Sequence, residues 1–194
     1  MANHLALVLV DTINAFDFEG SEPLVVAAER ASRCIETLAR RARAAGVPVI
    51  YVNDNFGQWR SDFRATIEGC TAPGKPGREV SLRLRPEKDD YFVLKPMHSA
   101  FYATPFELLL DELEVESLIV TGFAADLCVL FTAHDAHMRG YRLLVPSDCT
   151  ASNSPAITER ALTHLREALS ADLAPSPTIE LSRRAERAPK RRAP

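Results

Sequence analysis

The most constraining feature of this chain is an alternation between short apolar runs and longer stretches with helical periodicity. The first run, Leu5–Val10 (LALVLV), contains no polar residue, as is typical of a strand covered on both faces of a parallel sheet. From Leu24 to Ala45, apolar residues recur at about every third or fourth position, and Gly46 follows as a common helix C-terminal residue. The alternation continues to the end of the chain and predicts a three-layer α/β domain with a mostly parallel sheet.

Five further apolar runs are predicted to be strands, and helical patterns separate most of them. The runs are Val47–Val52, Tyr91–Leu94, Ser117–Val120, Tyr141–Val145 and Thr178–Leu181. Residues 56–90 fit neither pattern and contain the glycine- and proline-rich segment Ala72–Gly77. We expect an insertion or lid here, with one short helix around Ser61–Ile67, because long irregular connections are often functional.

Charge divides the chain into an acidic body and a basic end. Residues 183–194 carry six basic residues and one acidic residue, a net charge of +5. Because the whole chain has a net charge of −3, residues 1–182 carry −8. An acidic body argues against a nucleic-acid-binding domain. We therefore expect one domain over residues 1–182, followed by a basic, disordered tail over residues 183–194.

Several other classes of protein find no support in the sequence. No apolar run approaches the roughly 20 residues of a membrane span, and the N-terminal run reads as a buried strand and not as a signal peptide. The four cysteines lack CxxC and metal-ligand spacing, which favours a reducing, cytoplasmic setting. Because no glycine-rich nucleotide motif follows any strand, no cofactor is expected.

Cys128 occupies a position that favours reactivity. The run Ser117–Val120 stops at Thr121-Gly122, and the helical pattern that follows carries Cys128 in about its first turn. Backbone N–H groups point outward at the start of a helix, and they lower the pKa of a thiol and can bind an oxyanion. The sequence therefore predicts Cys128 as a nucleophile with a lowered pKa.

Two charged residues, Asp11 and Lys95, follow other predicted strands. The carboxyl ends of parallel strands meet at one edge of a sheet, so Asp11, Lys95 and Cys128 are expected to lie together. A carboxylate can take the proton of a thiol, and an ammonium can stabilise the thiolate and hold the carboxylate. Taken singly, the three are also compatible with a turn residue, a surface lysine and a small buried cysteine. Together they predict a site.

The order and spacing of these segments resemble the isochorismatase-like cysteine hydrolases, which include nicotinamidases and N-carbamoylsarcosine amidases. The segments that carry the resemblance are LVLVDTINAF, YVNDNFGQW, Lys95–Thr104 and Thr121–Val129. The resemblance implies a six-stranded parallel sheet flanked by helices and a triad at Asp11, Lys95 and Cys128. It also implies a cis peptide between Phe123 and Ala124, which turns the Ala124 N–H toward that of Cys128 to form an oxyanion hole.

The function implied by the resemblance is hydrolysis of an amide-like C–N bond in a small molecule through a thioester at Cys128. Asp11 would protonate the leaving amine and then activate water. A homo-oligomer, dimer or tetramer, is also implied. Metal-dependent nicotinamidases carry Asp-x-His near the second strand end, whereas here Asp54 is followed by Asn55 and Phe56. No metal is therefore expected.

Residues in the loops near the strand ends are candidates for substrate binding. They are Phe16, Asn55, Trp59, His98 and Phe123. Trp59 could equally anchor a lid, and His98 could simply satisfy a turn. Asp126 is expected to cap the helix that carries Cys128. Three other functions stay open: an isochorismatase-type vinyl-ether hydrolase, a non-hydrolytic reactive-thiol protein and a scaffold.

Overall fold

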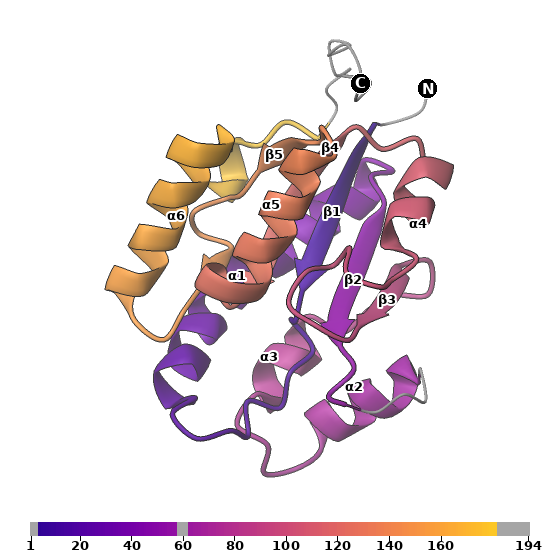
Figure 1. The fold of residues 1–194 in the computed structure, drawn as a ribbon. Helices are drawn as coiled ribbons and strands as arrows, with labels where there is room; N and C mark the ends of the chain where they lie inside the picture. Colours follow the sequence, from indigo (N-terminus) through magenta and orange to yellow (C-terminus); the bar gives the residue numbers. More distant parts are fainter. Residues whose placement is uncertain (1–3, 58–61, 182–194) are drawn as a thin grey trace.

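The computed structural model describes residues 4–57 and 62–181, and its helices and strands alternate along most of this part of the chain (Figure 1). Trp59 and the basic end, residues 183–194, lie outside the described residues. The strands are β1 (Leu5–Val10), β2 (Val49–Asp54), β3 (Tyr91–Lys95), β4 (Ser117–Phe123), β5 (Arg142–Leu144) and β6 (Thr150–Ala151). The helices are α1 (Glu22–Ala44), α2 (Phe63–Thr71), α3 (Arg78–Arg83), α4 (Phe106–Glu112), α5 (Leu130–Met138) and α6 (Pro155–Leu169). The π-helix η1 (Ala125–Val129) precedes α5, and the 3-10 helix η2 (Ser176–Thr178) follows α6.

The six strands form one parallel sheet, and this confirms the predicted fold class. The strand order is β3-β2-β1-β4-β5, and β6 pairs with the end of β4. At the carboxyl end of the sheet, Val10 of β1 is in register with Val52 of β2 and with Gly122 of β4. A Cβ atom at Gly122 would lie 2.0 Å from the Val10 carbonyl oxygen, so glycine is required where these two strand ends meet.

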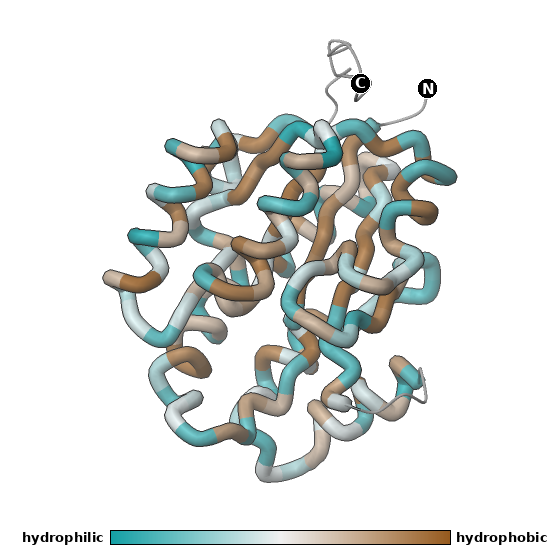
Figure 2. The backbone as a smooth tube through the Cα atoms, in the orientation of Figure 1, coloured by the Kyte–Doolittle hydropathy of each residue, from teal (hydrophilic) through white to brown (hydrophobic). Residues whose placement is uncertain are grey.

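Helices cover both faces of the sheet, and successive strand residues supply two separate cores. One core joins the β1 residues Leu5, Leu7 and Leu9 to the buried faces of α1, α2 and α3. The other joins Ala6, Val8 and Val10 to α4, α5 and α6. Figure 2 shows the hydrophobic segments concentrated in the central strands. This double coverage explains why the strands appear in the sequence as continuous apolar runs.

Two sequence predictions about the elements are wrong. The Thr178–Leu181 segment is not a strand. The guanidinium of Arg41 donates to the Ser176 and Ile179 carbonyls at 2.7 and 2.6 Å, which occupies backbone groups that a strand would use for pairing. The sixth strand is instead Thr150–Ala151, which is too short to give a periodic signal. Residues 56–90 contain two helices, α2 and α3, where one was expected.

The direction of the strands places the candidate residues. Because all strand pairings are parallel, the carboxyl ends of β1, β2, β3 and β4 lie at the same end of the sheet (Figure 1). In the part of the chain that the structure describes, no helix is long and apolar enough to cross a membrane.

Candidate active site

Asp11 follows the last residue of β1 and turns its side chain across the sheet end. Its backbone has a φ of 50°, in the left-handed region that a non-glycine residue rarely adopts. One carboxylate oxygen, Oδ1, accepts the backbone N–H of Asp54 at 2.7 Å. The residue is only 5% exposed. Asp11 is therefore a buried carboxylate held between the ends of two strands.

Lys95 ends β3 and supplies the positive charge of the site. Its side chain is fully buried, and Nζ lies 2.8 Å from Oδ2 of Asp11 and 3.9 Å from Oδ2 of Asp54. A buried ammonium is tolerated when it is paired with an opposite charge. Both of its carboxylate partners come from strand ends, so the parallel sheet itself assembles this ion pair.

Cys128 completes the cluster from η1, just beyond β4. Its Sγ lies 3.5 Å from the Nζ of Lys95, and the Asp11 carboxylate is close enough to raise the pKa of the thiol. The Phe123–Ala124 peptide, between β4 and η1, is cis. The three side chains that the sequence places at separate strand ends are thus in contact in the structure.

The ionisation of the thiol differs from the sequence expectation. Burial and the Asp11 carboxylate raise the pKa of Cys128 to about 12, although Lys95 opposes them. The prediction of a lowered pKa at a helix start is wrong because the low dielectric and the neighbouring anion outweigh the cation. Burial likewise raises the pKa of Asp11, against the opposing charge of Lys95. The resting site is therefore a protonated thiol beside a carboxylate of raised basicity.

Two of the expected loop residues lie close to this cluster. His98 is half-buried, and its Nδ1 lies 3.7 Å from Sγ of Cys128. Asn55 follows β2, and its backbone N–H donates to the Lys95 carbonyl at 3.0 Å. Asn55 also lines a cavity of about 460 Å³ together with Phe56 and Leu94.

Two other expected loop residues are part of the core. Phe16 and Phe123 are 0% and 1% exposed, and their rings pack edge to face with centroids 6.0 Å apart. The turn that contains Phe16 is closed by a hydrogen bond from Ser21 Oγ to the Phe16 carbonyl, and the ring faces the core instead of the open loop surface. Asp126 does not cap η1, because its carboxylate accepts the Ser152 hydroxyl instead.

Sequence reasoning missed two residues that support the site. The carboxylate of Asp54 lies near Lys95, and its backbone N–H donates to Asp11. Its position at the end of a predicted strand, next to Asn55, is the sequence feature that could have identified it. Phe131 lies three residues after Cys128, a helical spacing that puts both on one side, and its ring centroid is 5.4 Å from that of His98.

The donor atoms around Lys95 do not fit a metal ion. The Asp54 carboxylate accepts the Phe56 N–H at 2.6 Å and faces an ammonium, which competes with any cation. Over residues 4–57 and 62–181, no group of three or more His, Cys, Asp or Glu side chains is arranged to hold a metal.

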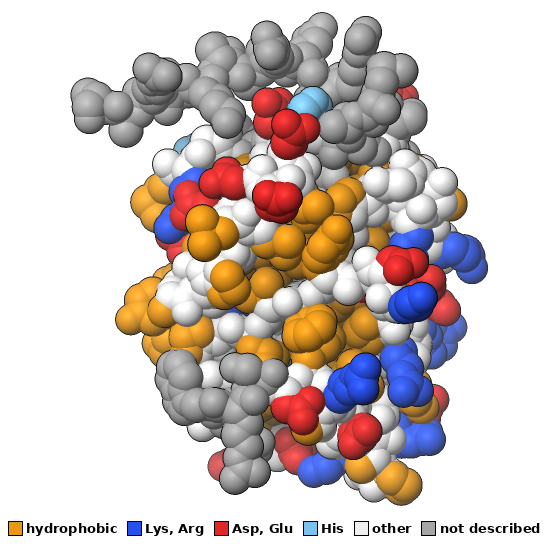
Figure 3. All heavy atoms as spheres, turned by 90° about the vertical axis from the view of Figure 1, so that its right-hand side faces the viewer, with side chains coloured by type: hydrophobic (Ala, Val, Ile, Leu, Met, Phe, Trp, Pro, Cys, Tyr) orange, Lys and Arg blue, Asp and Glu red, His pale blue; other side chains and the backbone are white. Residues whose placement is uncertain are grey.

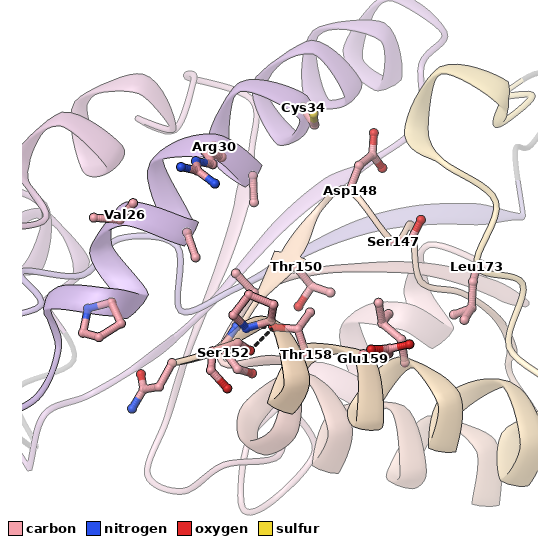
Figure 4. Close-up of a pocket in the computed structure, with 18 of the residues that line it drawn as sticks. Val26, Arg30, Cys34, Ser147, Asp148, Thr150, Ser152, Thr158, Glu159 and Leu173 are labelled. Atoms are coloured by element: carbon pink, nitrogen blue, oxygen red, sulfur yellow. Dashed lines mark hydrogen bonds between the residues drawn. The ribbon is translucent and has the colours of Figure 1, made fainter.

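A separate groove of about 1040 Å³ runs between α1 and α6 (Figure 4), and none of Asp11, Lys95 and Cys128 lines it.

Comparison with known proteins places the chain in a family. The model of the isochorismatase domain matches residues 5–174. The chain belongs to the isochorismatase family. It is 42% identical over 168 residues to the uncharacterized isochorismatase family protein YaaI of Bacillus subtilis, covering 87% of this chain and 92% of that protein. It is also 35% identical over 147 residues to streptothricin hydrolase of Streptomyces noursei, covering 76% of this chain but only 54% of that protein.

Solved structures agree with this family assignment. The N-carbamoylsarcosine amidase of Thermoplasma acidophilum superposes with a TM-score of 0.70 at 29% identity, over 91% of this chain and 98% of that one. The chain is therefore a hydrolase of the isochorismatase family, related to amidases.

Proposed function

We propose that the protein is a cysteine hydrolase that cleaves an amide-like C–N bond of a small molecule through a thioester at Cys128. The observation that carries the proposal is the contact of Cys128 Sγ with Lys95 Nζ at 3.5 Å, with the same Nζ paired with Asp11 Oδ2 at 2.8 Å. A thiol, a general base and a fixed cation in mutual contact are the components of nucleophilic catalysis.

Attack on the carbonyl begins with transfer of the thiol proton to Asp11. The raised pKa of Cys128 means that this proton leaves only as the S–C bond forms, and the raised pKa of Asp11 makes that carboxylate a better acceptor. Lys95 keeps its charge, since Asp11 and Cys128 raise its pKa against the effect of burial. It thereby stabilises negative charge on sulfur.

The tetrahedral intermediate carries a negative oxygen that needs hydrogen-bond donors. We assign this role to the backbone N–H groups of Ala124 and Cys128, which flank the first turn of η1 beyond the cis peptide. In the simplest scheme Asp11 then passes its proton to the leaving amine, and water hydrolyses the thioester.

The names of the relatives favour this chemistry over cleavage of a vinyl ether. N-carbamoylsarcosine amidase of Arthrobacter and the ureidoacrylate amidohydrolases, which match over 80% or more of this chain, are named as amide-type hydrolases. We propose substrates of this general kind, small amides and carbamoyl or ureido compounds, without assigning any one of those relatives' substrates to this chain.

A panel of substrates tests the proposal. Small primary amides, carbamoyl compounds, ureido compounds and a vinyl ether are each incubated with the wild-type chain and with Cys128→Ala. We expect turnover of at least one amide, carbamoyl or ureido compound, and its loss in the variant. Turnover of the vinyl ether alone, or equal turnover by the variant, would show that the proposal is wrong.

We also propose that the chain assembles into a homo-oligomer, dimer or tetramer. Figure 3 shows hydrophobic side chains gathered on the face that lies on the right of Figure 1. The exposed large apolar residues of β3, the loop after it and α4 are Tyr91, Phe92, Met97, Tyr102 and Leu108. An exposed apolar face is typical of an interface. Size-exclusion chromatography with light scattering measures the molar mass in solution, and we expect the mass of a dimer or tetramer. The mass of a monomer at micromolar concentration would contradict the proposal.

A further inference from the structure

The turn from Ala124 to Cys128 carries both of the backbone N–H groups to which we assign the oxyanion. Inside the turn, the N–H groups of Leu127 and Val129 both donate to the Ala124 carbonyl at 3.2 Å. These two hydrogen bonds set the internal shape of the turn. A second set of contacts, made from outside the turn, orients it against the rest of the site.

The outside contact comes from Ser152, which directly follows β6. Its hydroxyl donates to Oδ1 of Asp126 at 2.5 Å and accepts the backbone N–H of Asp126 at 3.3 Å. Asp126 is the middle residue of the turn, two positions from Ala124 and two from Cys128. A single hydroxyl on a residue that is 1% exposed is thus bonded to the side chain and the backbone between the two assigned donors.

Ser152 is itself fixed by a helix and by the sheet. Its backbone N–H donates to Thr158 Oγ1, near the start of α6, at 2.9 Å (Figure 4). The two residues before it form β6, which pairs with Gly122 and Phe123 at the end of β4. The Thr150 hydroxyl adds a hydrogen bond to the Gly122 carbonyl at 2.8 Å. Ser152 therefore has the firm support that a residue needs if it is to preorganise a site.

We propose that Ser152 is a positioning residue for the oxyanion hole, an inference that rests on the proposed hydrolysis at Cys128. Ser152 acts through Asp126 and not on the substrate. Its two hydrogen bonds hold the N–H groups of Ala124 and Cys128 where negative charge develops on the carbonyl oxygen. Donors that are oriented in advance favour the transition state because they need no reorganisation during the reaction. Without the hydroxyl, both donors stay but the turn can move.

The test compares two kinds of reaction at the Cys128 sulfur. Hydrolysis of acetamide, N-carbamoylglycine or p-nitrophenyl acetate passes through a tetrahedral oxyanion. Alkylation by iodoacetamide instead displaces iodide from a saturated carbon and forms no oxyanion. In the full-length chain, Ser152→Ala should lower kcat for hydrolysis by on the order of 10- to 100-fold, less than the roughly 10²- to 10³-fold loss typical of removing a donor itself. The KM and the alkylation rate should stay within about twofold of those of the wild type.

Further variants separate positioning from general damage to the fold. Asp126→Ala and Asp126→Asn both remove the carboxylate charge, but asparagine keeps an oxygen that can accept the Ser152 hydroxyl. We expect Asp126→Ala to lose kcat as Ser152→Ala does, and Asp126→Asn to recover most of that loss. The matched control is Asn153→Ala, which changes the exposed neighbour of Ser152 in the groove and should leave all rates within about twofold.

Several results would overturn the role of Ser152 while leaving a Cys128 hydrolase intact. They are equal losses of hydrolysis and alkylation, an increase in KM alone, no loss in Ser152→Ala, and equal losses in the two Asp126 variants. If the wild type hydrolyses the ester but neither the amide nor the carbamoyl probe, the proposed C–N hydrolysis is wrong for these substrates, and the effect of Ser152→Ala on the ester still tests the oxyanion turn. A wild type that hydrolyses none of the three would overturn both proposals.

Discussion

Two of the cysteines that lie beside an aspartate, Cys128 and Cys34, differ in their surroundings. Cys128 lies beside Asp11 at the end of the sheet, and Cys34 on α1 lies beside Asp148 in the groove of Figure 4. Burial and the neighbouring carboxylate raise the thiol pKa in both cases. A thiol–carboxylate contact is therefore not sufficient to identify a nucleophile.

The difference lies in what else the carboxylate binds. Asp11 is paired with the buried ammonium of Lys95, which also contacts the Cys128 sulfur. Asp148 instead accepts the backbone N–H and the hydroxyl of Ser176 at 2.8 and 2.7 Å. Within the described residues no lysine or arginine forms an ion pair with Asp148. The pair of Cys128 and Asp11 combines a transferable proton with the fixed positive charge of Lys95. Asp148, beside Cys34, instead holds the segment that contains Ser176 in place.

The largest expected effect separates the two thiols directly. Cys128→Ala should reduce hydrolysis by on the order of 10⁴-fold or more, because the covalent intermediate cannot form. Cys34→Ala, the matched control, should leave kcat/KM within about twofold. Steady-state assays and circular dichroism of both variants check this. Comparable losses from the two substitutions would remove the distinction between the pairs.

The second test removes the cation. Lys95→Met should lower the free energy of unfolding by about 3–5 kcal/mol, because it leaves the Asp11 carboxylate buried and unpaired. Adding Asp11→Asn should restore part of this stability, since the two residues interact directly. Arg30→Met, on the exposed rim of the groove, should change stability by no more than about 0.5 kcal/mol. Urea denaturation measures the wild type, these three variants and Asp11→Asn alone, and additive losses in the double variant would argue against coupling.

The third test uses pH. A pKa of about 12 leaves Cys128 protonated near neutrality, so its thiolate fraction increases about tenfold for each unit of rising pH. Alkylation of Cys128 by iodoacetamide should therefore accelerate about tenfold per unit between pH 7 and 10. Peptide mapping by mass spectrometry follows Cys128 and Cys34 in the same sample. A Cys128 rate that is already constant at pH 7 would indicate a resting thiolate and contradict the mechanism.

The smallest expected effect concerns Asp148, the carboxylate beside Cys34. Burial favours the protonated form of Asp148, but the hydrogen bonds from Ser176 outweigh it and hold the pKa of Asp148 below its ordinary value. Its stabilising contribution is therefore present above pH 4 or so and is lost as the pH falls through the lowered pKa. Asp148→Asn should cost about 1 kcal/mol at pH 7 and almost nothing near pH 2, with hydrolysis unchanged. A loss of activity would give this pair a role in catalysis.

Much of the fold could be predicted because its strands are covered on both faces. Leu5–Val10 is apolar throughout and is found as β1 with the predicted bounds. Thr150–Ala151 was missed because two residues carry no periodicity, and its pairing depends on contacts with the distant Gly122. The sequence pattern predicts a strand when all of its residues are buried, as in β1. It does not predict a strand as short as β6, which forms only because it pairs with β4.

The candidate site shows the same division. Asp11, Lys95 and Cys128 could be placed together because each follows a strand in a parallel sheet. The ionisation of the thiol could not be predicted, since it depends on how completely burial and Asp11 overcome Lys95. Nor could the burial of Phe16, which follows from a turn with a φ of 50° at that residue. These outcomes are set by three-dimensional distances and not by the order of residues.

The position of Lys95 in the sheet has a consequence for how the site behaves over time. Lys95 belongs to β3, an edge strand of the described sheet, which pairs with β2 alone. Outer elements open more often than the global unfolding free energy would allow. Opening of β3 would move the Lys95 ammonium away from Asp11 and Cys128 while β1 and β4 keep their pairing. Local opening of β3 would therefore abolish activity without global unfolding, and we expect activity to be lost on warming below the temperature at which the whole domain unfolds.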